Sequence, residues 1–324
     1  MVDAPVNRVF VIVAMEQEVR PLVTQFKLQP VDSCFVPGAP FVAWVGNVQG
    51  VTLHAVWCGR DPRFGNVNNV ATTAAAVATY AAIAAFGAPD LVLSAGTAGG
   101  FAACGARVGD VFLSSKCVFH SRRIPGGDDG QLEEYGFGHY RSPPLGGLAA
   151  RAGVKLGVVS TSDSLDTVPM DLELMRAEGA AVKEMEAAAV AWVCSALGVP
   201  FVAVKAITDI VDGPHATRGE FESNLEMASD ALQAKVALVL SLLSGTPLRQ
   251  WTQSRGASEV PLAQTPQPSP PAPAPTSLPL ARLSSREVLP DRSDRGPVWM
   301  TAVGGALVGA LVVVAVQMRT ARGR

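Results

Sequence analysis

The feature that most constrains the fold is a regular alternation of strand-like and helix-like segments from the N-terminus to about Gly245. Short apolar runs such as 8–14 and 199–207 read as buried strands, whereas 69–86 is an Ala-rich helical segment. Such alternation is typical of an α/β domain with a parallel or mixed sheet. We therefore predict three layers, with a central mixed sheet flanked by helices.

The remaining predicted elements are helices at 16–25, 186–197 and 219–243, strands at 90–95, 110–119 and 156–161, and a hairpin of 41–45 with 51–57. In open α/β sheets, ligands gather beyond the carboxyl ends of the strands. Four pairs of residues fall there: Met15-Glu16, Gly96-Thr97, Ser162-Asp163 and Thr208-Asp209.

Composition argues against several classes of function. The net charge of -2 over 324 residues gives no general attraction for nucleic acid. The 5 Cys are scattered without a C-x-x-C pair, which favours reduced thiols over a disulfide framework. The 4 His have no zinc-binding spacing. We expect no metal or organic cofactor and no nucleic-acid partner.

The chain changes character after a predicted catalytic domain at 1–245. Pro-rich sequence at 246–297 cannot bury a core and favours extended, solvated conformations, so we predict a disordered linker. The apolar run at 298–317 has the length to cross a bilayer, with Trp299 at its border. This pattern predicts a C-terminal transmembrane helix, a short basic tail at 318–324, and a cytosol-facing protein anchored to a membrane.

The segment 182–191 is the most informative stretch for chemistry. Its carboxylates, Glu184 and Glu186, stand at the mouth of an Ala-rich helix, and Asp209 ends the next strand-like run. Carboxylates at the ends of two buried elements, without obvious metal ligands, indicate a site that binds a sugar and donates a proton. The Gly-rich run 94–101 allows a close backbone approach to a ligand, but it is neither a P-loop nor a dinucleotide fingerprint.

Five motifs in this order resemble the 5′-methylthioadenosine/S-adenosylhomocysteine nucleosidase family: Ala14–Glu18, Ala95–Phe101, Val108–Phe112, Glu184–Val190 and Ala206–Asp209. Two further runs, 119–125 and 183–186, are similar to its plant-type branch. The resemblance covers about residues 8–244 and implies the fold of the purine nucleoside and uridine phosphorylase superfamily. It implies a homodimer that hydrolyses 5′-methylthioadenosine to adenine and 5-methylthioribose in methionine salvage, and it leaves S-adenosylhomocysteine open as a second substrate.

The resemblance also implies roles for individual residues. Asp209 matches the general acid that protonates adenine, and Glu18 matches the carboxylate that directs the attacking water. From the residues alone, Asp209 could equally cap a turn, and Glu18 could be an acid in the first turn of a helix. Glu186 matches the residue that accepts hydrogen bonds from the ribose hydroxyls. The other predicted substrate-binding residues are Thr97, Gly99, Leu165, Lys183, Glu184 and Met185.

The sequence departs from the bacterial members of this family at the base site. Where they carry Gly-Asp-Ala-Phe-Ile, with the Phe stacking on adenine, this chain has 162–166, and Leu165 takes the aromatic position. Plant-type members also carry Ser-Leu-Asp, so activity remains the expectation. In this family a neighbouring subunit closes the 5′ end of the pocket, and the candidate loop here is 126–140.

Two other functions remain open. A nucleoside phosphorylase needs a cationic phosphate site, for which Arg60 and the Arg122-Arg123 pair are the candidates. A carboxylate at Glu18 would repel phosphate, which favours water as the attacking group. The other alternative is a catalytically silent, membrane-tethered protein that binds a nucleoside without turnover.

Overall fold

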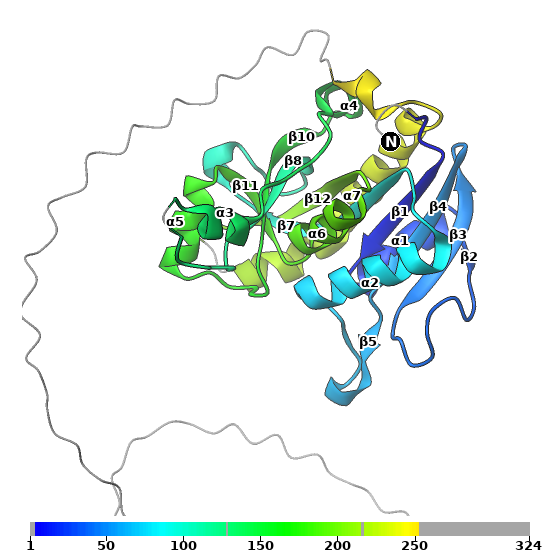
Figure 1. The fold of residues 1–324 in the computed structure, drawn as a ribbon, viewed down its shortest axis with the longest axis horizontal. Helices are drawn as coiled ribbons and strands as arrows, with labels where there is room; N and C mark the ends of the chain where they lie inside the picture. Colours follow the sequence, from blue (N-terminus) through cyan, green and yellow to red (C-terminus); the bar gives the residue numbers. More distant parts are fainter. Residues whose placement is uncertain (1–3, 128, 215–216, 253–324) are drawn as a thin grey trace, which may run out of the picture. The chain divides into compact units, whose positions relative to one another are not determined.

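The computed structural model describes residues 4–127, 129–214 and 217–252 (Figure 1). Within these residues, a mixed ten-stranded sheet has the order β11-β10-β8-β12-β7-β1-β4-β3-β2, and β9 pairs with β8. Its strands are β1 (Arg8–Val13), β2 (Gln29–Pro30), β3 (Val42–Val48), β4 (Val51–Trp57), β7 (Leu91–Gly100), β8 (Val111–Phe119), β9 (Tyr140–Arg141), β10 (Lys155–Thr161), β11 (Ala180–Glu184) and β12 (Phe201–Ile210). A separate ribbon pairs β5 (Arg60–Asp61) with β6 (Val67–Asn68).

Helices cover both faces of the sheet. They are α1 (Glu16–Gln25), α2 (Ala71–Phe86), α3 (Gln131–Phe137), α4 (Gly146–Ala152), α5 (Pro169–Ala177), α6 (Ala187–Leu197) and α7 (Thr217–Leu243). Strand side chains alternate between the two faces, so each strand supplies two cores. On β1, Val9 and Val11 join a cluster with α1, α4 and α7, whereas Phe10 and Ile12 pack with α2 and α6.

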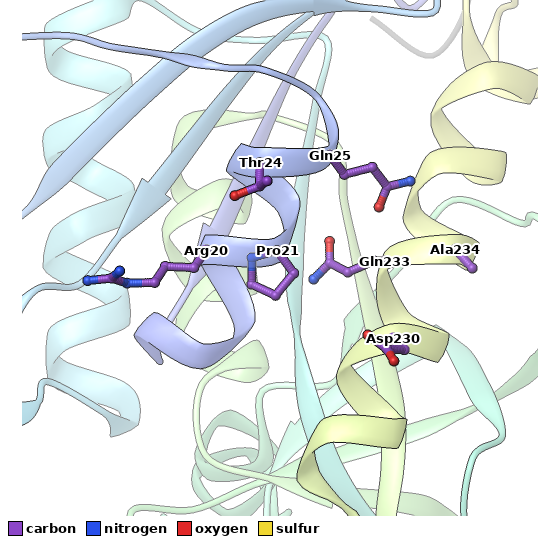
Figure 2. A pocket seen from close by; sticks show the side chains of 7 residues that line it. All are labelled: Arg20, Pro21, Thr24, Gln25, Asp230, Gln233 and Ala234. Carbon is purple, nitrogen blue, oxygen red and sulfur yellow. The ribbon is translucent and has the colours of Figure 1, made fainter.

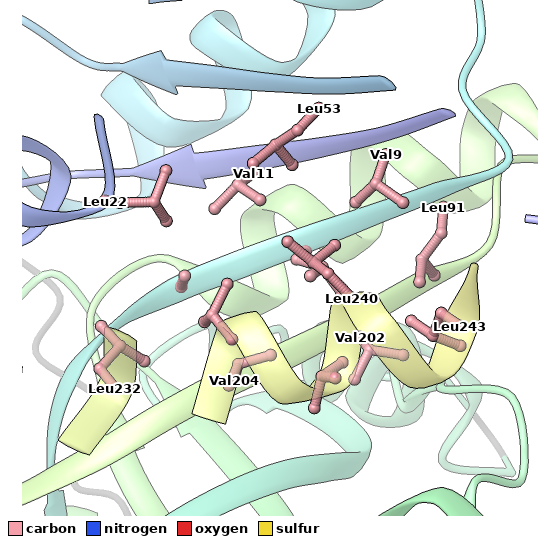
Figure 3. Close-up of a cluster of buried hydrophobic side chains, with 14 of the residues drawn as sticks. Val9, Val11, Leu22, Leu53, Leu91, Val202, Val204, Leu232, Leu240 and Leu243 are labelled. Atoms are coloured by element: carbon pink, nitrogen blue, oxygen red, sulfur yellow. The ribbon is translucent and has the colours of Figure 1, made fainter. Parts of the chain in front are cut away.

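Two helices on one face of the sheet, α1 and α7, bear directly on the pocket described below. Figure 2 shows α1 beside α7, and Figure 3 shows Leu232, Leu240 and Leu243 of α7 packed against the sheet. The buried apolar side chains between α7 and strands β7 and β12 hold this long helix along the sheet. The predicted α/β architecture with a central mixed sheet is confirmed.

The centre of the sheet differs from the prediction in one respect. The Gly-rich run expected as a loop after residue 95 remains in strand β7 as far as Gly100. It pairs with β12 on one side, and Gly99 and Gly100 pair with the antiparallel β11 on the other. A Cβ on Gly99 would lie 2.6 Å from Val211 Cγ2, so any larger residue at position 99 would clash with the side chain of Val211.

Several other elements also differ from the predictions. Strand β11 was not expected, because Lys183 and Glu184 read as polar residues at the mouth of a helix, yet both are buried. The short helices α3, α4 and α5 were not expected either. By contrast, α1 spans the predicted range 16–25, and α2, α6 and α7 begin within two residues of the predicted starts.

The predicted transmembrane helix and membrane localisation require correction. No helix within the described ranges is both long and apolar enough to cross a membrane. The longest of them, α7, carries Glu226, Asp230 and Lys235 along its length. The predicted span at 298–317 and most of the predicted linker lie outside the described residues. The described fold is therefore an α/β domain without a spanning helix, and neither the transmembrane part of the predicted fold class nor the membrane-anchored localisation is supported.

The packed chain continues beyond residue 245. Val6 donates a backbone hydrogen bond to Thr246, and Leu248, in the short 3-10 helix Leu248–Trp251, is buried in the core. These contacts pair the two ends of the described chain.

Candidate active site

One pocket, of about 260 Å³, is lined by every residue to which the family resemblance assigned a catalytic or substrate-binding role. Glu16, Gly96, Ser162 and Asp163, which were also expected at the strand ends, do not line it. It lies where β7, β11 and β12 end and where α1, α2 and α7 begin. Its lining residues are Ala14, Met15, Glu18, Val70, Thr97, Ala98, Gly99, Leu165, Lys183, Glu184, Met185, Glu186, Thr208, Asp209 and Phe221. The fold therefore brings together residues from both ends of the domain.

Glu18 lies in the first turn of α1 and is only 3% exposed. Its Oε1 accepts hydrogen bonds from the backbone N–H of Thr97, at 2.6 Å, and from the Thr97 hydroxyl, at 2.8 Å. The absence of a side chain at Gly96 leaves room for this carboxylate, because a Cβ there would lie 3.1 Å from Oε1. Burial raises the pKa of Glu18, while the Thr97 bonds and the charge of Lys205 act in the opposite direction.

Glu16, in the same turn, faces away from the pocket. It pairs with Arg20 and Arg60, and these partners lower the pKa of its carboxyl against the effect of burial. Of the two acids that open α1, only Glu18 is therefore placed to act on a ligand.

Asp209 is the penultimate residue of β12, and its two carboxyl oxygens lie in different environments. Oδ1 lies 2.7 Å from the hydroxyl of Thr208, whereas Oδ2 is buried and has no hydrogen-bond partner among the described residues. Burial raises the pKa of Asp209, opposed by the Thr208 hydroxyl and by the charge of Lys183. A raised pKa favours the protonated form, and Oδ2 is the oxygen available to carry the proton.

Glu186 faces the pocket from the N-terminal end of α6. Its Oε1 accepts a hydrogen bond of 2.9 Å from the N–H of Ala71, the first residue of α2. Burial raises the pKa of Glu186 to about 7, Lys205 acts to lower it, and the charge of Glu184 acts to raise it. The side chain is 14% exposed, and this exposed part faces the pocket.

Glu184 engages both of its oxygens with the protein. It accepts hydrogen bonds from the N–H groups of Glu186 and Ala187 and from the hydroxyl of Thr161. Its Oε2 also lies 2.8 Å from the ammonium group of Lys205. The structure thus places Glu184 at the pocket wall with its oxygens already engaged, and it ties β11 to the start of α6.

Lys183 organises the loop that follows β10. Its ammonium group donates to the carbonyl oxygens of Ser164 and Leu165, both at 2.7 Å. Burial lowers the pKa of Lys183, against the charges of Asp209 and Glu184. Leu165, at 45% exposure, stands at the pocket where bacterial relatives were expected to carry an aromatic residue.

Three contributors were missed at the sequence level. Lys205 lies within an apolar strand run, where a charged residue indicates that an oppositely charged partner is buried nearby. Phe221 lines the pocket from near the start of α7, and Val70 lines it from the position just before α2. Nothing in their local sequence distinguishes them from ordinary core residues.

The arginines considered for a phosphate site lie elsewhere. Arg60 pairs with Glu16, Arg122 donates to the carbonyls of Gly136 and Tyr135, and Arg123 lies 3.6 Å from Asp171. The described residues that line the pocket include no arginine. The candidate loop 126–140 contributes none of these lining residues either.

The sequence and fold match a known family. The model of the phosphorylase superfamily matches residues 8–244. A 5′-methylthioadenosine nucleosidase from Arabidopsis thaliana is 39% identical over 245 residues, covering 75% of this chain and 90% of that protein. A 5′-methylthioadenosine/S-adenosylhomocysteine nucleosidase from the same plant is 38% identical over 242 residues, covering 74% and 93%.

Solved structures agree with these matches. The apo structure of Arabidopsis thaliana 5′-methylthioadenosine nucleosidase aligns with a TM-score of 0.72 at 38% identity, covering 76% of this chain and 99% of that one. A nucleosidase from Colwellia psychrerythraea in complex with adenine aligns with a TM-score of 0.59 at 28% identity, covering 75% and 98%. The chain therefore belongs to the phosphorylase superfamily and, within it, to the 5′-methylthioadenosine/S-adenosylhomocysteine nucleosidase family, as its motifs suggested.

Proposed function

We propose that this protein hydrolyses the N-glycosidic bond of 5′-methylthioadenosine, yielding adenine and 5-methylthioribose. The observation that carries the proposal is the convergence of Asp209, Glu18 and Glu186 on one pocket, each with different partners. Three carboxylates in different environments can serve as a proton donor, a water-directing group and a sugar-binding group.

Asp209 acts as the general acid. As the bond between the ribosyl carbon and adenine breaks, electrons move onto the base, and a proton from Oδ2 of Asp209 neutralises them. The buried, unpartnered Oδ2 and the raised pKa of Asp209 support this role, because both favour a carboxylic acid that holds a proton before the reaction. Such proton transfer typically contributes about 10²–10⁴ in rate.

Glu18 directs the water. Water adds its hydroxyl to the ribosyl carbon and gives its proton to Glu18, and both carboxyl groups then exchange protons with solvent. The two bonds from Thr97 fix Oε1, whereas Oε2 accepts one hydrogen bond from the described residues, from the N–H of Met15 at 3.2 Å. The oxygen with the single, longer bond is the better placed acceptor for a water molecule.

Glu186 binds the ribose. A carboxylate can accept both diol protons, and charged hydrogen bonds of this kind contribute roughly 1.5–3 kcal/mol each. Apolar side chains of Met15, Val70 and Phe221 line the same pocket and suit an uncharged methylthio substituent. Lys183 and Leu165 form the base side through the 164–165 loop.

Water is favoured over phosphate as the attacking group. The pocket presents carboxylates at Glu18 and Glu186, which repel an anion, and the described lining residues supply no arginine. The direct test incubates the full chain with 5′-methylthioadenosine in phosphate-free buffer and measures adenine. Stoichiometric adenine and 5-methylthioribose are expected, whereas release that strictly requires phosphate would establish a phosphorylase. Binding without release would establish a silent binding protein.

A parallel assay with S-adenosylhomocysteine determines whether the larger substituent is accepted.

The protein acts as a homodimer in this proposal. Helices α2 and α6 pack side by side and expose large apolar side chains, with Tyr80 at 59%, Val77 at 51% and Trp192 at 45% exposure. An exposed apolar patch of this kind favours association with a second copy. Sedimentation of the wild type and of the Tyr80→Glu/Trp192→Glu double variant tests it. A dimer that becomes a monomer is expected, and a fully active monomeric wild type would contradict the proposal.

A further inference from the structure

Helix α7 makes polar contacts with both chain segments that carry the proposed catalytic acids. Near its start, the side-chain amide of Asn224 donates to the carbonyl oxygen of Thr208 at 2.8 Å. Further along, the amide of Gln233 donates to the carbonyl oxygen of Glu18, also at 2.8 Å. The first contact holds the residue before Asp209, and the second holds Glu18 itself.

The contact at the strand end is reinforced. Glu220, one turn before Asn224, accepts a hydrogen bond of 3.0 Å from the N–H of Ile210. The backbone on both sides of Asp209 is thus bonded to α7. Because the side chain of Asp209 leaves from this short segment, a shift of the segment would move its Oδ2 relative to the base.

The contact at α1 is buried. Gln233 is only 4% exposed, and Figure 2 shows its side chain between α7 and α1, among Pro21, Thr24 and Gln25. It joins positions that are 215 residues apart in the sequence. Its acceptor belongs to the first turn of α1, so the bond fixes the turn that presents the Glu18 carboxylate to Thr97.

The helix between these contacts is suited to keep them apart at a fixed spacing. Asn224 and Gln233 are separated by about 13 Å along a helix axis, at 1.5 Å per residue. Ala228 and Leu232, between them, are buried in the core that α7 shares with the sheet. An α-helix packed along its length changes its dimensions little, since interiors are close-packed.

From this arrangement we propose that α7 is the element that sets the position of Glu18 relative to Asp209, with Asn224 and Gln233 as positioning residues. The inference rests on the proposed nucleosidase function. Neither residue touches the pocket, so each acts through the backbone that it holds. A positional error of about 1 Å can cost as much as 100-fold in rate, so loss of either contact should lower kcat more than it weakens binding.

The test replaces each amide by an apolar side chain of similar size, as Asn224→Leu and Gln233→Met in the full chain. With 5′-methylthioadenosine, each variant should lose about tenfold or more in kcat, with KM changed less than about twofold. The Kd for adenine should also stay within about twofold, because the pocket lining is unchanged.

Two control variants come from the same helix. Ser229 is buried and its hydroxyl has no hydrogen-bond partner among the described residues, so Ser229→Ala should leave kcat and KM unchanged. Leu240→Ala, beyond the stretch between the two contacts, removes core packing without touching either polar contact, so it should lower the melting temperature and leave the kcat of the folded enzyme unchanged.

The outcomes separate the two proposals. An inactive wild type would refute the nucleosidase function itself. An active wild type whose Asn224 and Gln233 variants lose only thermal stability, with kcat intact, would refute the positioning role. Equal losses of kcat in Leu240→Ala and Gln233→Met would also refute it, because the effect would then follow from destabilisation alone.

Discussion

The ammonium group of Lys205 lies 2.8 Å from Oε2 of Glu184, and both side chains are almost completely buried. Burial alone would lower the pKa of Lys205, but the charges of Glu184 and Glu186 outweigh it and raise that pKa to about 12. Burial would likewise raise the pKa of Glu184, and Lys205 reverses the direction. The ion pair therefore stays charged beneath the pocket, and its cation also lies 3.9 Å from the carboxylate of Glu186, the residue proposed to bind the ribose.

Removing the cation should destabilise the fold. Lys205→Met leaves Glu184 as a buried, uncompensated charge, which typically costs about 3–5 kcal/mol. Urea unfolding at pH 7 measures the change. The matched control is Arg218→Met, which breaks the exposed pair with Glu222 and should cost less than about 1 kcal/mol. Similar losses in the two variants would show that the buried pair has no special role in stability.

Stability should depend on pH through Glu186. Its folded pKa of about 7 lies above the value of 4.5 for an unperturbed glutamate. The folded protein therefore binds more protons than the unfolded chain between these values, and this contribution to stability is lost as pH rises from 4.5 through 7. The loss should amount to about 3 kcal/mol, and Glu186→Gln should remove it.

The titration of Glu186 should also change substrate affinity, which should increase with pH where stability decreases. The ionised form of Glu186 is the better acceptor for the ribose hydroxyls, so affinity for 5′-methylthioadenosine should rise as pH passes through about 7. Unfolding curves and Kd values, each measured from pH 5 to 8, test the two effects. Glu222→Gln, on an exposed face of α7, is the control, and a pH dependence unchanged in Glu186→Gln would disprove the assignment.

Asp209→Asn should nearly abolish turnover while leaving the pocket intact. The amide keeps the shape of the carboxyl and its position beside Thr208, but it cannot give up a proton to adenine. We expect kcat to fall by about 10²–10⁴ and the Kd for adenine to change little. Asp230→Asn, at an exposed position of α7, should behave as the wild type. A variant at position 209 with near-normal kcat would exclude the role of Asp209 as the acid.

The central fold could be predicted because its strands and helices carry their signals locally. Apolar runs such as 199–207 predict buried strands, and the Ala-rich segment that ends at Gly87 predicts α2. The Gly-rich run and the acids at 18, 186 and 209 could be placed because the family motifs order them along the chain. The structure brings these residues to one pocket.

The remaining features depend on contacts that no local pattern encodes. Lys183 and Glu184 were expected at the mouth of a helix, yet they lie in a buried strand, where their charges find partners at Ser164 and Lys205. Asn224 and Gln233 resemble ordinary polar residues of an amphipathic helix. Their partners lie far away in sequence, so only the folded chain reveals their bonds.

The backbone of Ala71 is strained, with a φ of 75°, while its N–H donates to Glu186. A residue with a Cβ in this left-handed region costs about 1–3 kcal/mol, whereas glycine adopts it freely. Ala71→Gly should therefore raise the free energy of unfolding by about 1 kcal/mol and keep kcat, since the N–H remains. Ala75→Gly, inside the same helix, should instead lower it by about 1 kcal/mol. Urea unfolding measures both changes, and equal destabilisation by the two glycines would show that position 71 is not strained.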